Sequence, residues 1–186
     1  YLMLSEKAEV VEACLEQFEQ ADNMTERLTA LAVLVNSPFE AERDKALQAF
    51  AEHFKDNPLV MDQWFSVQAG NPLPGGLERV QTLMQHPAFT LKNPNKVRAL
   101  IGAFAGQNLL GFHQADGSGY RFLADQVIVL NALNPQIASR LLAPLTRWAK
   151  YDSARQQLMK AELQRILDTG ELSSDVYEVV SKSLVG

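Results

Sequence analysis

The chain has 186 residues, of which 47% are hydrophobic and 21% are charged, and its formal net charge at pH 7 is −5. This composition is typical of a globular protein and argues against a disordered chain, and no apolar run approaches the roughly 20 residues of a membrane-spanning helix. The acidic balance also argues against a nucleic-acid-binding surface.

The charges are distributed unevenly. Residues 1–56 contain twelve acidic and five basic residues, whereas residues 93–170 contain nine basic and five acidic residues. Such asymmetry indicates either two faces with different partners or two solvated surfaces that merely differ. The single cysteine, Cys14, excludes an internal disulfide and fits a reducing compartment, so we expect a cytoplasmic protein. Because Tyr1 opens directly onto a helical pattern, we also expect a segment of a longer polypeptide.

The first third of the chain has the pattern of three helices. Apolar residues recur at helical spacing over residues 4–18. Asn23 and Glu26 have the spacing of a capping box, which predicts a second helix. Ser37 precedes a proline and is the expected N-cap of a third helix over about 38–54.

Asn-Pro pairs punctuate the rest of the chain. Three of the four pairs are typical of an asparagine N-cap followed by proline at the first helical position, and the pair at 71–72 instead opens a loop. Asp116 and Gly117 predict a turn, with Ser118 capping the next helix. Pro144 should kink the helix that contains it. We expect helices over about 76–85, 94–106, 118–133, 135–150 and 152–169, and a last one from about residue 174.

This pattern predicts an all-α fold. No stretch alternates with period two between hairpin turns, so no sheet is expected. About ten short helices joined by tight turns favour antiparallel hairpins stacked side by side as a curved, solenoid-like superhelix, within a single domain over residues 1–186. The concave surface of such a stack usually binds or covers something.

Catalytic and metal-binding patterns are missing from the sequence. The three histidines are far apart, and none has the partner at four-residue spacing that a zinc site such as H-E-x-x-H requires. The glycine-rich stretches at 74–76 and 116–122 do not follow a strand, as a phosphate-binding loop would. We therefore expect no catalytic residue and no metal ligand in this chain.

Arg98 is the last charge in a strongly apolar helix, and no carboxylate follows it in the chain until Asp116. One side of this helix is an apolar stripe, formed by Val97, Leu100, Ile101 and Phe104. The other side carries only small residues, namely Ala99, Gly102, Ala103 and Gly106. Small residues allow close approach of a neighbouring backbone, so we expect this helix to be covered on both sides. Arg98 would then lie at a seam and need a carboxylate, carbonyl groups or a watery channel.

A second arginine is a possible companion. In the helix from Pro135, a core-facing stripe begins at Ile137, whereas Arg140 shares a different face with Arg147 and Tyr151. Two hypotheses stay open at this point: Arg140 and Arg98 face an anion together, or Arg140 is simply a solvated surface residue.

The stretch "NPNKVRALIGAFAGQN…FHQADGSGYRFLADQVIVLNALNPQIASRLLAPLTRWAKYD" resembles the carboxy-terminal domain of bacterial aminopeptidase N, the zinc-dependent alanyl aminopeptidase family. The resemblance is strongest over residues 93–152 and extends over most of the chain, more loosely before residue 50. In that family an upstream catalytic domain carries H-E-x-x-H, a distant zinc-binding glutamate and G-x-M-E-N, none of which occurs here.

The resemblance implies a non-catalytic domain of helix pairs that forms a bowl over the catalytic cleft. Zinc would be bound by the parent's catalytic domain, and the partners would be that upstream domain and peptide substrates. Arg98 and Arg140 match arginines that could attract a peptide's carboxy-terminal carboxylate, and structural ion pairing is the alternative role. A free-standing helical-repeat adaptor that binds a protein through its concave face is the alternative function.

Overall fold

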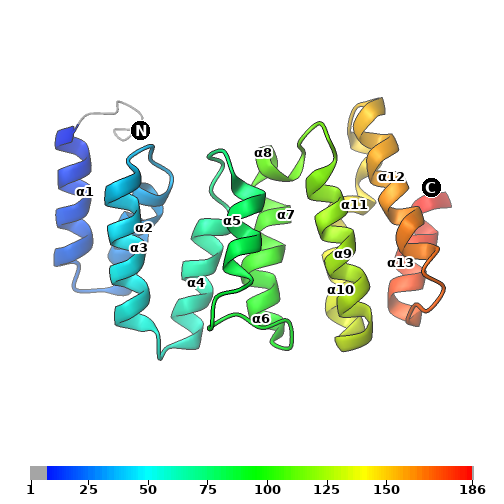
Figure 1. Cartoon of the computed structure of the whole chain (residues 1–186), viewed down its shortest axis with the longest axis horizontal. Helices are drawn as coiled ribbons and strands as arrows, with labels where there is room; N and C mark the ends of the chain where they lie inside the picture. The colour runs from blue at the N-terminus through cyan, green and yellow to red at the C-terminus, as the bar shows by residue number, and fades with distance from the viewer. Residues whose placement is uncertain (1–7, 186) are drawn as a thin grey trace.

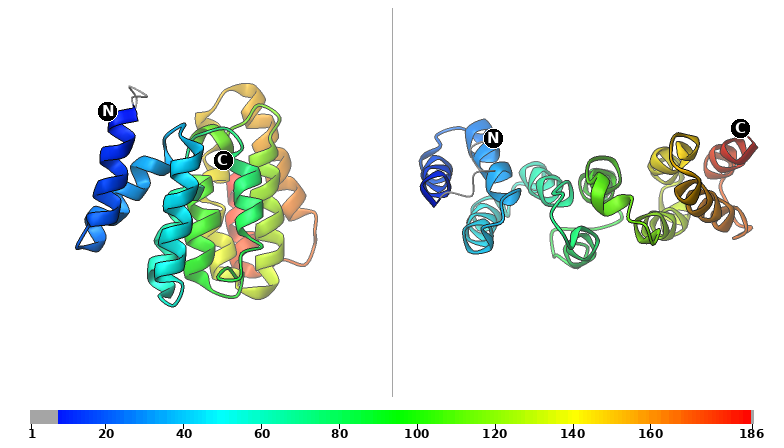
Figure 2. Two further views of the ribbon diagram at one scale, coloured as in Figure 1. Left: turned by 60° about the vertical axis from the view of Figure 1, so that its left-hand side comes forward. Right: turned by 90° about the horizontal axis from the view of Figure 1, so that it is seen from above.

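The computed structural model describes residues 8–185 and contains only helices and loops over that range. Figure 1 shows the helices standing side by side along one long axis, with α1 (Ala8–Gln20) and α13 (Ser174–Val185) at opposite ends. Figure 2 shows the same layered row from above, bending along its length. The predicted all-α superhelical stack of antiparallel helices is therefore confirmed. No helix in the described range is long and apolar enough to cross a membrane.

Helices that follow one another in the chain pack together, as in α1 with α2, α9 with α10 and α12 with α13. Short connections favour such packing of neighbours in the chain. The remaining elements are α2 (Met24–Val35), α3 (Glu40–Phe54), α4 (Pro58–Ala69), α5 (Gly76–Leu83), α6 (Pro94–Val97), a π-helical turn (Arg98–Gly102), α7 (Ala103–Gln107), α8 (Leu109–Phe112), α9 (Ser118–Leu133), α10 (Pro135–Leu141), α11 (Ala143–Thr146), a 3₁₀ turn (Trp148–Lys150) and α12 (Ser153–Leu167).

The predicted asparagine caps are confirmed. The side chain of Asn23 accepts a hydrogen bond from the backbone N–H of Glu26 at 2.9 Å. The asparagines of the three helical Asn-Pro pairs do the same for α4, α6 and α10. Each cap satisfies an N–H group that has no partner within its own helix, so these sites set where the helices begin.

The two predicted serine caps are wrong. Ser37 is buried and donates its hydroxyl hydrogen bond back to the carbonyl of Leu34 at 2.7 Å, so it closes the end of α2, and α3 begins at Glu40 without a side-chain cap. Ser118 is the first residue of α9 and not its cap. There, Asp116 accepts from the backbone N–H of Ser118 at 3.0 Å. In both cases a competing local bond decides which polar side chain meets the helix terminus.

Two further boundaries differ from a simple helical pattern. The expected kink at Pro144 is a break, since α10 ends at Leu141 and α11 begins at Ala143. Proline removes a backbone donor and clashes with the preceding turn, which explains the interruption. The short helix α8 was not predicted, because its sequence Leu-Leu-Gly-Phe is too short to show a period.

Two buried asparagines hold the middle of the stack together. Asn108 donates from its Nδ2 to the carbonyls of Ala69, at 3.2 Å, and Asn71, at 2.7 Å, and its Oδ1 accepts from the N–H of Gly111. Asn71 in turn donates to the carbonyl of Val35 at 2.7 Å. Both side chains are fully buried with these bonds made, so they satisfy the ends of α2 and α4 and fix the path of the chain into α8.

Aromatic side chains join this middle section to the C-terminal helices. The ring of Phe104 in α7 packs edge-on against Phe122 in α9, with 5.7 Å between ring centroids. Phe112 in α8 packs against Tyr120 at 5.3 Å. Between these pairs Gly119 lies directly against the carbonyl group of Phe112, where a side-chain carbon would collide. The start of α9 is therefore pinned closely to α7 and α8.

This close approach gives a stability prediction. Gly119→Ala should lower the free energy of unfolding by about 2 kcal/mol, because the added carbon must push the Phe112 backbone aside. Gly106→Ala is the matched control, since no atom lies within 4 Å of the added carbon, and alanine should be neutral or stabilising by up to about 1 kcal/mol in a helix. Urea denaturation measures both, and equal effects of the two substitutions would contradict the packing described here.

Candidate functional site: a pocket with two arginines

Arg98 and Arg140, widely separated in the sequence, line one pocket of about 540 Å³. We call it the arginine pocket. One wall comes from the π-helical turn and α7, and the other comes from α10. The wall residues are Arg98, Gly102, Ala103, Gly106 and Gln107 on the first side and Ile137, Arg140 and Leu141 on the second. The pocket therefore combines two cations with an apolar and small-residue floor.

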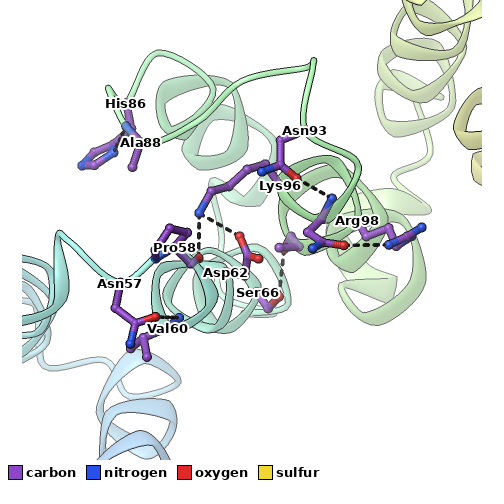
Figure 3. Close-up of polar contacts among 12 residues, drawn as sticks. Asn57, Pro58, Val60, Asp62, Ser66, His86, Ala88, Asn93, Lys96 and Arg98 are labelled. Atoms are coloured by element: carbon purple, nitrogen blue, oxygen red, sulfur yellow. Dashed lines mark hydrogen bonds and ion pairs between the residues drawn. The ribbon is translucent and has the colours of Figure 1, made fainter. Parts of the chain in front are cut away.

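Both guanidinium groups are exposed, and neither forms a salt bridge within residues 8–185. Arg98 donates from Nη1 to the side-chain oxygen of Asn95 at 2.8 Å, and Figure 3 draws this bond as a dashed line from Arg98. By contrast, Arg155 and Arg165 each contact a carboxylate at 2.7 Å. The arginine pocket thus presents positive charge without a neutralising acid at contact distance, which favours an anion.

The expectation that neighbouring elements cover both sides of this helix is wrong in part. Gly102 does lie close to α10, since a carbon added to it would be 3.7 Å from Leu141. Gly106, however, has open space beside it and forms part of the pocket wall. Arg98 is consequently exposed and not at a buried seam. The opposite, apolar stripe from Val97 to Phe104 is fully buried, as predicted.

The helix that carries Arg98 contains a π-helical turn that the sequence did not predict. The backbone N–H of Ala103 bonds to the carbonyl of Arg98, five residues back, and also to Leu100. The carbonyl of Ala99 would be the acceptor for Ala103 in an ordinary α-helix. It is bonded instead by the hydroxyl of Ser66 in α4, at 3.0 Å. Such single π turns occur frequently at functional sites.

A buried ion pair anchors the same helix to α4. Lys96 Nζ lies 2.8 Å from Asp62 Oδ1, and the two side chains are only 6% and 13% exposed. Asp62 Oδ1 has no well-aligned hydrogen bond, so this contact is an ion pair. Lys96 also donates to the carbonyl of Pro58 at 2.9 Å, and its ammonium group lies over the ring of Phe65. Figure 3 shows both polar contacts beside Arg98.

Lys96 was not among the candidates from the sequence, because lysine side chains are almost always exposed. A usable signal did exist. Asp62 and Ser66 follow Pro58 at four-residue spacing on α4, so one helix face carries a carbonyl, a carboxylate and a hydroxyl. We call these three groups the polar edge of α4. A basic residue on a neighbouring helix is the natural partner for such an edge.

The remaining titratable candidates have packing roles. His113 makes a 2.7 Å hydrogen bond with Tyr120, and burial lowers its pKa, assisted by Arg155. The Nδ1 atom of His86 accepts from the N–H of Ala88, and burial and then nearby Lys96 lower the pKa of His86. Burial raises the pKa of Cys14. No group of three or more potential metal ligands occurs in the described range.

The Lys96–Asp62 pair gives a second stability prediction. Lys96→Met should lower the free energy of unfolding by about 3 kcal/mol, because it leaves the Asp62 carboxylate buried without a partner. The double variant Lys96→Met with Asp62→Leu should regain most of this loss, since no charge then stays buried. The exposed pair Lys55–Glu52 supplies the control, Lys55→Met, which should change little. If the double variant were no more stable than Lys96→Met, the ion pair would not be the cause.

Comparison with known proteins places the fold in a family. The family described as "Domain of unknown function (DUF3458_C) ARM repeats" matches residues 1–185. Aminopeptidase N of Escherichia coli strain K12 is 46% identical over 169 residues, which are 91% of this chain and 19% of that protein. Aminopeptidase N of Haemophilus influenzae is 44% identical over the same shares of the two chains.

A solved structure agrees. The crystal structure of Legionella pneumophila aminopeptidase A in complex with aspartic acid has a TM-score of 0.89 and 40% identity, over 95% of this chain and 21% of that one. The chain thus spans about one fifth of the length of the relatives it matches. The chain belongs to the DUF3458_C family of ARM-repeat domains, and its resemblance to bacterial aminopeptidase N is confirmed.

Proposed function

We propose that this chain is the non-catalytic C-terminal domain of a zinc-dependent aminopeptidase, a hydrolase that removes N-terminal amino acids from peptides. In this role it would enclose the active-site cavity and gate the access of peptides from the cytoplasm. Its partners would be the upstream catalytic domain of the same polypeptide and the peptide substrates. The match to one fifth of each aminopeptidase relative supports the assignment to a larger hydrolytic chain.

The substrate-binding part of this proposal rests on one observation, namely that Arg98 and Arg140 line the same pocket. A peptide substrate has a carboxylate at the end opposite to its scissile bond. Guanidinium stays charged at all physiological pH values and binds carboxylate through two parallel hydrogen bonds. With Ile137 and Leu141 beside the arginines, the pocket suits a carboxylate attached to a partly apolar chain. We therefore propose that Arg98 and Arg140 bind the substrate's carboxy-terminal carboxylate.

Zinc belongs to the proposed upstream domain. A catalytic zinc site uses three protein ligands and one open position, and the described residues hold no cluster of that size. The proposal gives this chain a role in binding and enclosure only. A closed cavity excludes water and large proteins from the reacting centre, which strengthens every electrostatic interaction within it.

Substitution of the arginines tests the carboxylate proposal in the full-length protein. Arg98→Ala or Arg140→Ala should lower kcat/KM for a tripeptide by roughly ten- to a hundredfold, the loss expected for one charge-assisted contact. Hydrolysis of an alanine amide, which lacks the carboxylate, should fall far less. Arg147→Ala is the matched control, because Arg147 is exposed just after α11 but does not line the pocket. Equal losses on the tripeptide and the amide would contradict the proposal.

Removal of the whole segment tests enclosure. The zinc-containing portion made without this domain should cleave an alanine amide but lose its preference for short peptides over polypeptides of about thirty residues, because nothing then limits the cavity. The measurement is the ratio of the two turnover rates, compared with that of the full-length protein, with zinc content as the control for folding. An unchanged ratio in a zinc-loaded fragment would contradict the gating role.

A further inference from the structure

The π-helical turn before α7 decides how Arg98 faces the arginine pocket. Arg98, Gly102 and Gly106 line the pocket at four-residue intervals. In an α-helix each such step overshoots a full turn by about 40°, so Arg98 would lie about 80° around the helix from Gly106. A π turn contains more residues, so its four-residue step does not overshoot in this way. The turn therefore keeps Arg98 closer to the line of the two glycines.

This turn releases one carbonyl group, and Ser66 binds it. The N–H of Ala103 bonds to Arg98 and Leu100, which leaves the carbonyl of Ala99 without its usual partner. Ala99 is only 8% exposed, so water has poor access to that carbonyl. A buried acceptor without a donor is destabilising. The hydroxyl of Ser66 supplies the missing donor at 3.0 Å, and Figure 3 draws this bond as a dashed line from Ser66.

The polar edge of α4 thus holds the Arg98 helix at two points, on either side of Arg98. Lys96, two residues before Arg98, is fixed to the carbonyl of Pro58 and to Asp62. Ala99, one residue after it, is fixed to Ser66. The first contact anchors the helix against α4 and would do so for any helical geometry. The second contact meets the carbonyl whose usual donor, the N–H of Ala103, bonds elsewhere in the π turn.

We propose that Ser66 is a positioning residue for Arg98, and that capture of a peptide carboxylate in the arginine pocket depends on the Ser66 hydroxyl. This inference rests on the proposed function of the pocket. Ser66 itself does not line the pocket. It would act only by stabilising the turn that directs Arg98 toward the carboxylate.

The test uses the full-length protein and steady-state kinetics. Ser66→Ala should raise KM for a tripeptide several-fold with little change in kcat, and should affect an alanine amide much less. Ser66→Thr keeps a hydroxyl and should restore the tripeptide KM. Ser181→Ala is the matched control, because Ser181 also donates to a backbone carbonyl, that of Glu178, but lies in α13 away from the pocket; it should leave both substrates unchanged.

A double-mutant cycle separates positioning from general stability. If Ser66 acts through Arg98, Ser66→Ala should add almost nothing to the tripeptide KM in the Arg98→Ala background. Amide hydrogen exchange of residues 98–103 should also become faster in Ser66→Ala than in Ser181→Ala. Additive effects in the cycle, or an equal loss on tripeptide and amide, would overturn the positioning role.

The cycle also distinguishes the two proposals. If Arg98→Ala weakens tripeptide hydrolysis but Ser66→Ala does not, the positioning role is wrong and the carboxylate site stands. If Arg98→Ala has no selective effect on the tripeptide, the carboxylate site itself is wrong, and the positioning role falls with it.

Discussion

The hydrogen bond from Ser66 to the carbonyl of Ala99 is the interaction on which the geometry of the arginine pocket depends. A helix normally pairs the N–H and C=O groups of its own backbone with one another. One irregular turn leaves a carbonyl oxygen without its usual donor, and another part of the fold must supply one. Helix α4 does so with its polar edge, which also binds Lys96. The stack therefore tolerates an irregular helix at its centre because the adjacent helix carries polar groups at the matching positions.

The polar groups in the middle of the stack are buried and almost fully paired. Asn71 and Asn108 join three helix ends with their side-chain amides, and Lys96 is held by a carboxylate and a carbonyl. Apolar packing alone has little directional preference, whereas an unpaired polar group in this environment is destabilising. These contacts thus select one relative placement of α4, α7 and α8. That placement is what sets the first wall of the arginine pocket.

The second wall comes from α10, and its position has a different origin. Helices α9 and α10 pack as a pair, and the start of α9 is pinned to α7 and α8 through Gly119 and the aromatic contacts of Phe104 and Phe112. Arg140 is carried by α10 and lines the same pocket as Arg98. Two like charges on one pocket repel each other. Their coexistence without a carboxylate at contact distance in the described range is consistent with a site that an anion fills.

Much of the fold was determined by local sequence. Asparagine caps, proline at first helical positions and apolar periodicity predicted the all-α class and most helix positions, because each of these signals acts within a few residues. Both serine caps failed, since Ser37 and Ser118 each had a competing local arrangement that a pattern does not rank.

The sequence alone also drew attention to Arg98 and Arg140 as charges in otherwise apolar or core-facing helices. Only the tertiary structure shows that the two arginines line one pocket and that Arg98 is exposed. It also shows that Gly106 has open space beside it and that the Lys96 side chain is buried. The π turn likewise depends on a hydroxyl more than thirty residues away in the chain. Local propensity fixes which segments are helical, whereas burial and pairing of polar groups between helices fix how those segments face one another, and no single segment contains that information.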